Sequence, residues 1–268
     1  MVLHLIGSNG FIGKAIQEKY VGSIKCWSST PALGDEYFDI FNPNTWEPLL
    51  SRSLDCVIIL SWPGLPRYSE TFHLTRNLPA CVKLVEALVE AKCEHIIVAG
   101  TCYEYGMQEG PLAETLIPIP CNQYALAKDT FRKALELICY KSGARWTWFR
   151  IFYPYGKSQN ENSLYPSLLR AIQAQDPVFN VGSRDKIRDF LPVENVAQSF
   201  VNAISSNTQN GIVNLGSGSP QTLECFVKSI CNQFTSSIEL NWDHYPNRED
   251  EPLQFWANVD KAKLLNLI

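Results

Sequence analysis

A tyrosine and a lysine four residues apart offer this chain its clearest route to proton-transfer chemistry. Tyr124 and Lys128 fall within 122–141, NQYALAKDTFRKALELICYK, whose pattern predicts a helix with both side chains on one face. An ammonium group beside a phenol favours the phenolate and lowers a pKa that starts at about 10. A tyrosine tuned in this way can pass a proton to or from a substrate oxygen near neutral pH. Taken alone, the spacing also fits a surface pair.

A hydroxyl group is predicted close to this pair. Residues 95–100, HIIVAG, read as a strand, and Thr101 follows at its carboxyl end, where ligands meet a parallel sheet. The Thr101 hydroxyl could hydrogen-bond a carbonyl oxygen. Thr101, Tyr124 and Lys128 are therefore the candidate catalytic residues.

Three glycines near the start of the chain predict a cofactor site. GSNGFIG, residues 7–13, follows the predicted strand 2–6 directly. Gly7 permits a tight turn, Gly10 lets a ligand approach the backbone, and Gly13 lets helix and strand pack closely. The helix that begins near Gly10 directs unpaired N–H groups at the turn, which suits a pyrophosphate. A dinucleotide site is favoured over a glycine turn without a ligand.

The end of the second predicted strand, 23–28, bears on which dinucleotide is bound. An acid there would hydrogen-bond the ribose of NAD, but the chain continues Ser28-Ser29-Thr30-Pro31. Hydroxyls can bond a 2′-phosphate, and the missing carboxylate removes a repulsive charge. The sequence therefore favours NADP(H), with NAD(H) as the alternative. Ordinary turn residues would look the same, and no arginine supports the phosphate.

These groups need a rigid frame, and strand–helix alternation supplies one. Further strands are predicted at 56–60 and 146–152, and further helices at 13–20 and 78–91. Nearly all-apolar strands in such an alternation predict an α/β fold with a Rossmann-type doubly wound parallel sheet. A small α/β substrate-binding lobe is expected beside it.

The second half of the chain is less regular. The patterns predict a helix at about 164–174, a short strand pair before residue 188, and then a helix at 193–205, a strand at 211–216, a helix at 222–234 and a strand at 238–240. We assign 1–156 and 188–215 to the dinucleotide-binding domain. The smaller lobe is assigned to 157–187 and 216–268.

Composition narrows the class of protein. The chain has 268 residues, 46% hydrophobic and 19% charged, with a net charge of −4, which argues against a nucleic-acid surface built from bulk charge. Its nine cysteines are scattered without a C-x-x-C pair, and the histidines share no metal-ligand spacing, so reduced thiols and no metal are expected. No apolar run reaches the roughly 20 residues of a membrane span. The expectation is a cytoplasmic protein.

The motifs together resemble an extended short-chain dehydrogenase/reductase, of the nucleotide-sugar epimerase/dehydratase/reductase group. The resemblance covers essentially the whole chain. It is carried by Gly7-x-x-Gly10-x-x-Gly13, Thr101 ahead of Tyr105-Gly106, Tyr124-x-x-x-Lys128, RIFYPYG (150–156), RDFLPVENVAQSF (188–200), GIVNLGSG (211–218) and NREDEPLQFWANVDKAKLLNL (247–267).

The resemblance implies a role for each matching residue. Tyr124 would be the acid/base, Lys128 would bond the nicotinamide ribose and lower the tyrosine pKa, and Thr101 would orient the sugar carbonyl. The implied cofactor-binding residues are Gly7, Asn9, Gly10, Phe11, Ile12, Gly13, Ser28, Ser29, Asp39, Ile40, Leu60, Ser61, Trp62, Lys128 and Pro154. The implied substrate-binding residues are Thr101, Cys102, Tyr103, Tyr124, Tyr153, Arg188 and Arg248. Arg188 would hold the substrate phosphates, unless it only pairs with Asp185 or Asp189.

Three positions depart from the family pattern. Thr101 replaces the usual serine, Tyr153 stands where many members have asparagine, and Leu60-Ser61-Trp62 replaces Leu-Ala-Ala, so that Trp62 would narrow the sugar pocket. Cys102 occupies the position of the acid that dehydratases carry, which makes dehydration a weak candidate.

The resemblance implies NADPH-dependent reduction of the 4-keto group of a nucleotide-diphosphate-linked 4-keto-6-deoxyhexose. Such deoxysugars serve surface polysaccharides such as lipopolysaccharide. One alternative is a nucleotide-sugar 4-epimerase with tightly bound NAD, which the missing acid after the second strand disfavours. Another is a non-catalytic dinucleotide-binding protein on the same fold. The oligomeric state, with a homodimer as one option, is left open.

Overall fold

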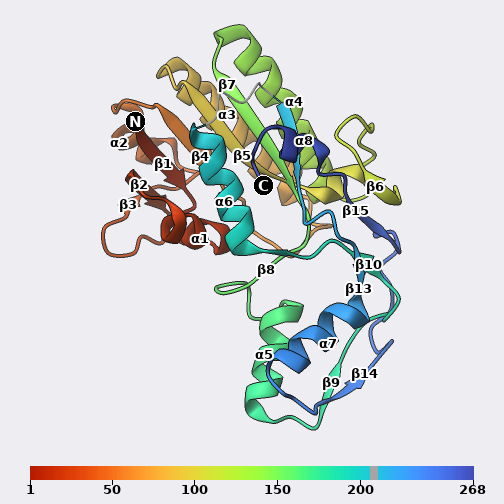
Figure 1. Ribbon diagram of the computed structural model, residues 1–268. Coiled ribbons are helices and arrows are strands. Elements are labelled where there is room, and N and C mark those ends of the chain that lie inside the picture. Colours follow the sequence, from red (N-terminus) through yellow and green to blue (C-terminus); the bar gives the residue numbers. More distant parts are fainter. Residues whose placement is uncertain (206–210) are drawn as a thin grey trace.

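A seven-stranded parallel sheet forms the centre of the molecule (Figure 1). The computed structural model describes residues 1–205 and 211–268. In spatial order the strands are β12 (Gly211–Leu215), β7 (Arg145–Ile151), β5 (His95–Thr101), β4 (Cys56–Ile59), β1 (Val2–Ile6), β2 (Ser23–Ser28) and β3 (Glu36–Tyr37). Every neighbouring pair is parallel. This order, with its reversal between β1 and β4, confirms the predicted doubly wound sheet.

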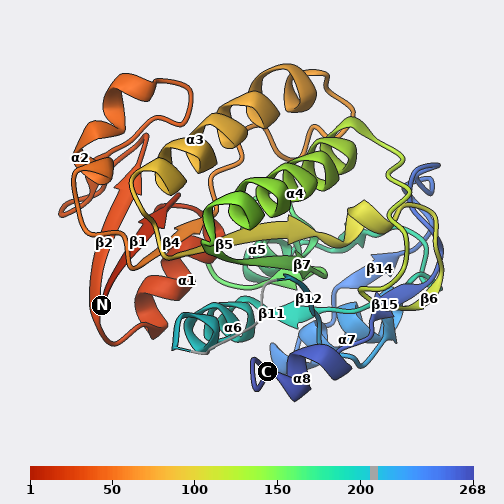
Figure 2. The ribbon, with the colours of Figure 1, turned by 90° about the horizontal axis from the view of Figure 1, so that it is seen from above.

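Helices cover both faces of the sheet, which is why β4 and β5 are buried along their whole length. Figure 2 shows the two layers. One face carries α2 (Glu47–Leu50), α3 (Leu78–Glu90) and α4 (Gln123–Ser142), and the other carries α1 (Phe11–Lys19), α6 (Val193–Ser205) and α8 (Asp260–Leu264). In α3 the buried residues Cys81, Leu84, Val85 and Leu88 follow helical spacing.

The predicted elements of the main domain are confirmed to within one or two residues at their ends. The largest shift is in α1, which begins at Phe11 because Gly10 is its N-cap. Three short turns between the main elements were not predicted: η1 (Pro43–Thr45), η2 (His73–Asn77) and η3 (Cys102–Tyr105).

A smaller lobe lies below the sheet in Figure 1, built from α5 (Leu164–Ala174), β9 (Val178–Asn180), α7 (Leu223–Gln233) and β14 (Glu239–Asn241). Its own core is organised around Phe190 and Phe226, whose rings stack with centroids 3.8 Å apart. The lobe therefore has a hydrophobic cluster separate from the two on the faces of the sheet.

Short strand pairs tie distant segments together. They are β8 (Pro154–Tyr155) with β11 (Leu191–Pro192), β10 (Ile187–Arg188) with β13 (Gln221–Thr222), and β6 (Gly110–Leu112) with β15 (Phe255–Ala257). The short strand pair predicted before residue 188 is not formed as such, since β9 pairs with β14 and β10 with β13. Residues 255–268 were assigned to the lobe, but β15 pairs with β6, and α8 packs against β12 of the central sheet.

Candidate active site

A cleft of about 600 Å³ opens at the carboxyl end of the sheet. Its walls come from the turn after β1, the segment after β4, the end of β5, the start of α4 and the segment after β7. Ligands bind doubly wound sheets where the strand order reverses, and here that point lies between β1 and β4. The cleft is thus where the fold predicts a ligand.

The glycine turn has the geometry of a phosphate cradle. Gly7 has a φ of +88°, and its N–H donates to the carbonyl of Trp27 at 2.8 Å. A Cβ atom at Gly13 would lie 2.5 Å from the carbonyl oxygens of Gly7 and Ser8, so only glycine fits. Gly10 caps α1 and lines the cleft with Phe11. The open amino end of α1 fits the pyrophosphate of a dinucleotide.

Thr101 is fixed by a turn that begins with it. Its Oγ1 accepts a hydrogen bond from the N–H of Tyr103 at 3.3 Å, and its own N–H donates to Glu104 Oε1 at 3.0 Å. Glu104 is buried and also accepts from Trp148 Nε1 at 2.9 Å and Arg150 Nε at 2.7 Å. This buried network holds the end of β5 in one conformation.

Tyr124 and Lys128 reach the same place from the first turns of α4. The helix begins after Asn122, whose Oδ1 accepts the N–H of Ala125 at 2.9 Å. The Tyr124 side chain is buried, and it lies in the cleft with Thr101, whose hydroxyl acts to lower the pKa of the phenol. One turn later, Lys128 Nζ donates to the carbonyl of Ala99 at 2.8 Å. The three candidate catalytic residues therefore meet in the cleft.

Burial controls the protonation of this pair. It raises the pKa of Tyr124, whereas the sequence predicted that Lys128 would lower it. Burial lowers the pKa of Lys128 to about 8, because an ammonium group is poorly solvated there. At neutral pH Tyr124 therefore keeps its proton, which is the form needed to protonate a substrate oxygen.

Most of the predicted cofactor residues line the cleft, and some do not. Lining residues from that set are Gly7, Gly10, Phe11, Ile12, Gly13, Leu60, Trp62, Lys128 and Pro154. Outside its lining are Asn9, Ser28, Ser29, Asp39, Ile40 and Ser61. Ile40 is part of the core, Asn9 donates its amide to the carbonyl of Thr30, and Ser28 Oγ accepts the N–H of Thr30 at 3.1 Å.

One carboxylate that lies near the glycine turn was not predicted from the sequence. Asp35 lies seven positions beyond Ser28, yet its Oδ2 accepts from the Ser8 hydroxyl at 3.0 Å and from the Ala32 N–H at 3.3 Å. Burial first and then Asp35 raise the pKa of Cys26 in β2 to about 11. An acid is therefore present at the end of β2 in space, although it is absent at that point of the sequence.

Arg188 is not placed as the resemblance implied. It is buried outside the cleft lining, and its guanidinium donates to the carbonyls of Ile187, Leu253 and Pro252, each at 2.8 Å. It also lies 3.2 Å from Glu251, and pairs with neither Asp185 nor Asp189 in the described residues. Its hydrogen-bonding groups are committed to the protein, so this geometry does not support phosphate binding by Arg188.

One wall of the cleft is aromatic. Trp62, Tyr103 and Tyr153 line it, and so does Tyr68, which the sequence did not single out. Arg248 lies at this wall, 4.9 Å from the centre of the Tyr68 ring and paired with Asp250 at 3.1 Å. The other predicted substrate residue in the lining is Cys102. Further lining residues that the sequence did not single out are Leu65, Pro66, Ala99, Gly100, Ile151, Gln159, Asn160, Asn162 and Ser163.

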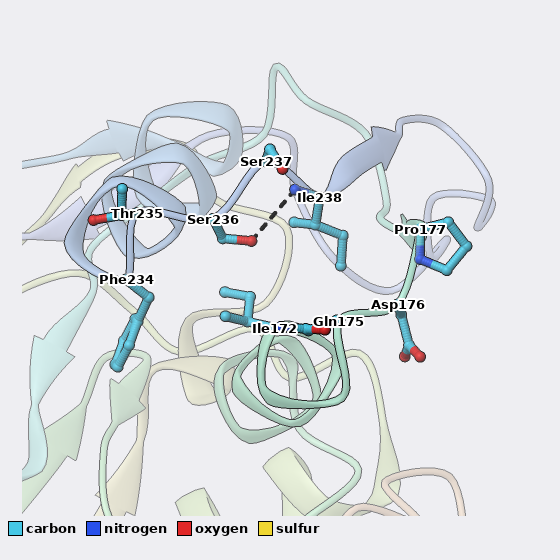
Figure 3. A pocket seen from close by; sticks show the side chains of 9 residues that line it. All are labelled: Ile172, Gln175, Asp176, Pro177, Phe234, Thr235, Ser236, Ser237 and Ile238. Carbon is cyan, nitrogen blue, oxygen red and sulfur yellow. Dashed lines mark hydrogen bonds between the residues drawn. The ribbon is translucent and has the colours of Figure 1, made fainter.

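A second, smaller pocket of about 370 Å³ lies in the lobe (Figure 3). It is formed where α5 and α7 end, between Ile172, Phe234 and Ile238, with Asp176 at its rim. Within 1–205 and 211–268 there is no group of three or more His, Cys, Asp or Glu side chains that could hold a metal ion. Over the same residues, no helix has the length and hydropathy needed to span a membrane.

Comparisons with known proteins identify a family and several relatives with named activities. The model of the NAD dependent epimerase/dehydratase family matches residues 3–216. The chain is 24% identical to the dTDP-6-deoxy-L-talose 4-dehydrogenase (NAD(+)) of Aggregatibacter actinomycetemcomitans, over 96% of this chain and 99% of that one. It is 28% identical to the dTDP-4-dehydro-6-deoxyglucose reductase of Escherichia coli, over 84% of this chain and 79% of that one.

Two solved structures share the fold. The UDP-glucuronic acid 4-epimerase of Bacillus cereus, in complex with UDP-glucuronic acid and NAD, has a TM-score of 0.85 at 21% identity, covering 100% of this chain and 94% of that one. RMD from Pseudomonas aeruginosa, complexed with NADPH, has a TM-score of 0.79 at 23% identity, covering 94% and 89%. The likeness confirms the Rossmann-type fold, and the two structures hold different dinucleotides.

Proposed function

Because this chain belongs to the NAD dependent epimerase/dehydratase family, we propose that it reduces the 4-keto group of a nucleotide-diphosphate-linked 4-keto-6-deoxyhexose. One observation carries the proposal: the side chains of Tyr124, Thr101 and Lys128 lie together in a cleft that begins at a glycine turn. Two relatives whose names describe 4-position redox chemistry on deoxysugars support the substrate class.

The residues divide the work of the reaction. Gly7, Gly10 and Gly13 would hold the dinucleotide, which supplies a hydride to the carbonyl carbon when it is bound. Tyr124 donates its phenolic proton to the C4 oxygen, so that the ketone becomes a hydroxyl group. The Thr101 hydroxyl hydrogen-bonds the same oxygen and orients it.

A 4-epimerase remains the second candidate. The acid whose absence spoke against it is supplied in space by Asp35. The aromatic wall of the cleft, where the sugar would lie, favours the reductase. An epimerase must present both faces of C4 to the nicotinamide, so the sugar has to turn over. Trp62, Tyr103 and Tyr153 line the cleft, and we infer that their rings hinder that motion. Three assembled catalytic groups argue against a non-catalytic protein.

For the cofactor we propose NAD(H) in place of the NADP(H) that the sequence favoured. The preference for NADP(H) rested on the lack of a carboxylate beside Ser28 and Ser29. Asp35 places a negative charge against Ser8, the second residue of the glycine turn, where it would repel a 2′-phosphate.

The test is to supply dTDP- and GDP-linked 4-keto-6-deoxyhexoses with NADH and to identify the products. Net consumption of NADH with formation of a 4-hydroxy sugar supports the reductase. Denaturing the purified protein should release little dinucleotide. Stoichiometric release of NAD, with interconversion of 4-epimers and no net NADH consumption, would establish the epimerase instead.

A further inference from the structure

The charge of Lys128 has an unusual setting. Its side chain is 4% exposed, and in the described part of the chain Nζ has one hydrogen-bond acceptor, the carbonyl of Ala99 at 2.8 Å. An ammonium group carries three donors. The nearest aromatic face is that of Trp62, whose ring centre lies 4.1 Å from Nζ, while the Trp148 ring centre lies farther away at 5.9 Å. A cation over an indole face at this distance is attracted by the ring, and more strongly when both are desolvated.

Trp62 is itself held by a buried histidine. Its Nε1–H donates to His73 Nδ1 at 3.1 Å, and His73 Nε2 lies 2.8 Å from the carbonyl of Arg67. The carbonyl can only accept, so Nε2 carries the proton and Nδ1 is free to accept from the indole. His73 is fully buried, and burial lowers its pKa, which keeps the ring neutral. The imidazole and indole rings are stacked with centroids 6.2 Å apart.

The turn that carries His73 is also fixed. η2 is a π-helical turn at the start of α3, and such turns recur at functional sites. Asn77, its last residue, donates its amide to the carbonyl of Pro63 at 2.8 Å. The segment after β4 is therefore bonded to η2 at Trp62, Pro63 and Arg67.

The same indole touches the other half of the catalytic pair. Trp62 meets Tyr124 edge-on with ring centroids 6.1 Å apart, and His73 meets Tyr124 at 5.4 Å. The hydrogen-bonded pair of Trp62 and His73 thus contacts both Tyr124 and Lys128.

We propose that Trp62, held in place by His73, is a positioning residue whose ring face keeps the Lys128 ammonium charged and directed along α4 beside Tyr124. This role rests on the proposed function, in which Lys128 bonds the nicotinamide ribose and supports proton transfer. Trp62 stands where the family pattern has a small residue, so the device belongs to this chain's own sequence.

A pH profile tests the proposal, because the ring face acts on the charged form of Lys128. The other groups that face Lys128 are Glu104 from η3, Cys81 from α3, His73 from η2 and Tyr124 on α4. Glu104 acts to raise the pKa of Lys128. His73 is neutral, so it adds no positive charge that would lower that pKa. Removing the ring face should lower the pKa of Lys128 and leave these other groups in place.

The experiment compares Trp62→Leu, which removes the ring face, with Trp62→Phe, which keeps a smaller ring face and loses the N–H. NADH affinity is measured by fluorescence titration across pH, and kcat is measured across pH with the keto sugar. In Trp62→Leu the loss of NADH affinity at alkaline pH should begin about one pH unit lower than in the wild type. In Trp62→Phe the loss of NADH affinity should begin at a pH close to the wild-type value, because this variant keeps a ring face.

Controls separate the proposal from general damage and from the proposed function. Trp242→Leu removes an indole near Arg184 in the smaller lobe, with 5.8 Å between guanidinium and ring, and should leave the pH limit unchanged. Trp62→Met also removes the ring but has a longer, flexible side chain, and it replaces the leucine variant if that variant unfolds. Identical pH limits for wild type, leucine and methionine variants would overturn the role of Trp62. A wild type that binds NADH but turns over no keto sugar would overturn the proposed function alone.

Discussion

Tyr124 and Lys128 are both buried in the cleft, and burial moves their pKa values in opposite directions. It raises the pKa of the phenol and lowers that of the ammonium group to about 8, so each group is pushed toward its neutral form. A neutral phenol suits a proton donor. A lysine whose charge is only just maintained at neutral pH carries a cost to the stability of the fold.

That cost predicts a stabilised variant. The folded-state pKa of Lys128 lies below its unfolded value, so the unfolded chain binds the proton more tightly. The penalty is complete below about pH 8 and disappears as the pH rises toward the unfolded pKa. Lys128→Met should therefore raise the free energy of unfolding by about 1–3 kcal/mol near neutral pH, while NADH affinity falls.

Urea denaturation at about pH 7 and about pH 10 checks this expectation. The gain of the methionine variant should shrink at the higher pH. A variant that is less stable than the wild type by the same amount at both pH values would contradict it.

Asp35 gives a prediction about the dinucleotide. Asp35→Asn removes the charge beside Ser8 and keeps the shape of the side chain. The ratio of NADH to NADPH affinity should fall about tenfold, equivalent to ~1.4 kcal/mol. Glu36→Gln is the matched control, because its carboxylate already pairs with Arg52 at 2.7 Å. Fluorescence titration with both cofactors measures the ratio, and an unchanged ratio in Asp35→Asn would return the preference to NADP(H).

At the scale of elements, the cofactor end of the cleft depends on how closely α1 approaches β1. The glycine turn leaves no room for a side chain at Gly13, because the carbonyls of Gly7 and Ser8 both lie in the way. Backbone carbonyl groups cannot change rotamer to make room, as a flexible side chain can.

Gly13→Ala should therefore displace the start of α1. We expect a loss of stability of about 2–3 kcal/mol together with a weaker cofactor affinity. Gly182→Ala is the control, because a Cβ there meets nothing within 4 Å. Thermal unfolding and NADH titration of both variants measure the effect, and a Gly13→Ala protein that matches Gly182→Ala in both would refute the cradle.

Local pattern was enough to predict the elements that carry the catalytic groups. The continuous apolar run of β5 indicates a buried strand, and the twenty residues of α4 contain no glycine or proline, so the sequence alone places Thr101, Tyr124 and Lys128 on these elements. Asp35 and Arg188 could not be placed in this way. Their positions depend on how loops fold back in space, which neither spacing nor periodicity encodes. The parallel pairing of β15 with β6 also depends on how distant segments fold back in space.

At the scale of the whole molecule, Arg188 joins segments that are far apart in the sequence. It comes from β10 and bonds the carbonyls of Pro252 and Leu253 and the carboxylate of Glu251, which also accepts from Tyr153 in the cleft wall. Lys186 Nζ adds a bond to Glu251 at 3.0 Å. This cluster connects β10 with residues 251–253, which lie just before β15.

Arg188→Ala should act on this connection and destabilise the protein by about 3–5 kcal/mol, because the carbonyls of Ile187, Leu253 and Pro252 each lose a buried donor and Glu251 loses one of its cationic partners. Arg170→Ala, on the exposed side of α5, should change stability little. Urea unfolding compares the two. A stable Arg188→Ala protein that has lost only its affinity for the nucleotide would instead support the phosphate role that the resemblance implied.

Proton donation by Tyr124 to a 4-keto nucleotide sugar is the central claim, and single-turnover reduction by Tyr124→Phe tests it most directly. The variant keeps the ring and its contacts with Trp62 and His73, and loses only the hydroxyl that meets Thr101. NADH affinity should stay near the wild-type value, while the rate of keto-sugar reduction should fall by about 10²–10⁴-fold. A Tyr124→Phe enzyme that binds NADH and reduces the 4-keto sugar at close to the wild-type rate would contradict the mechanism.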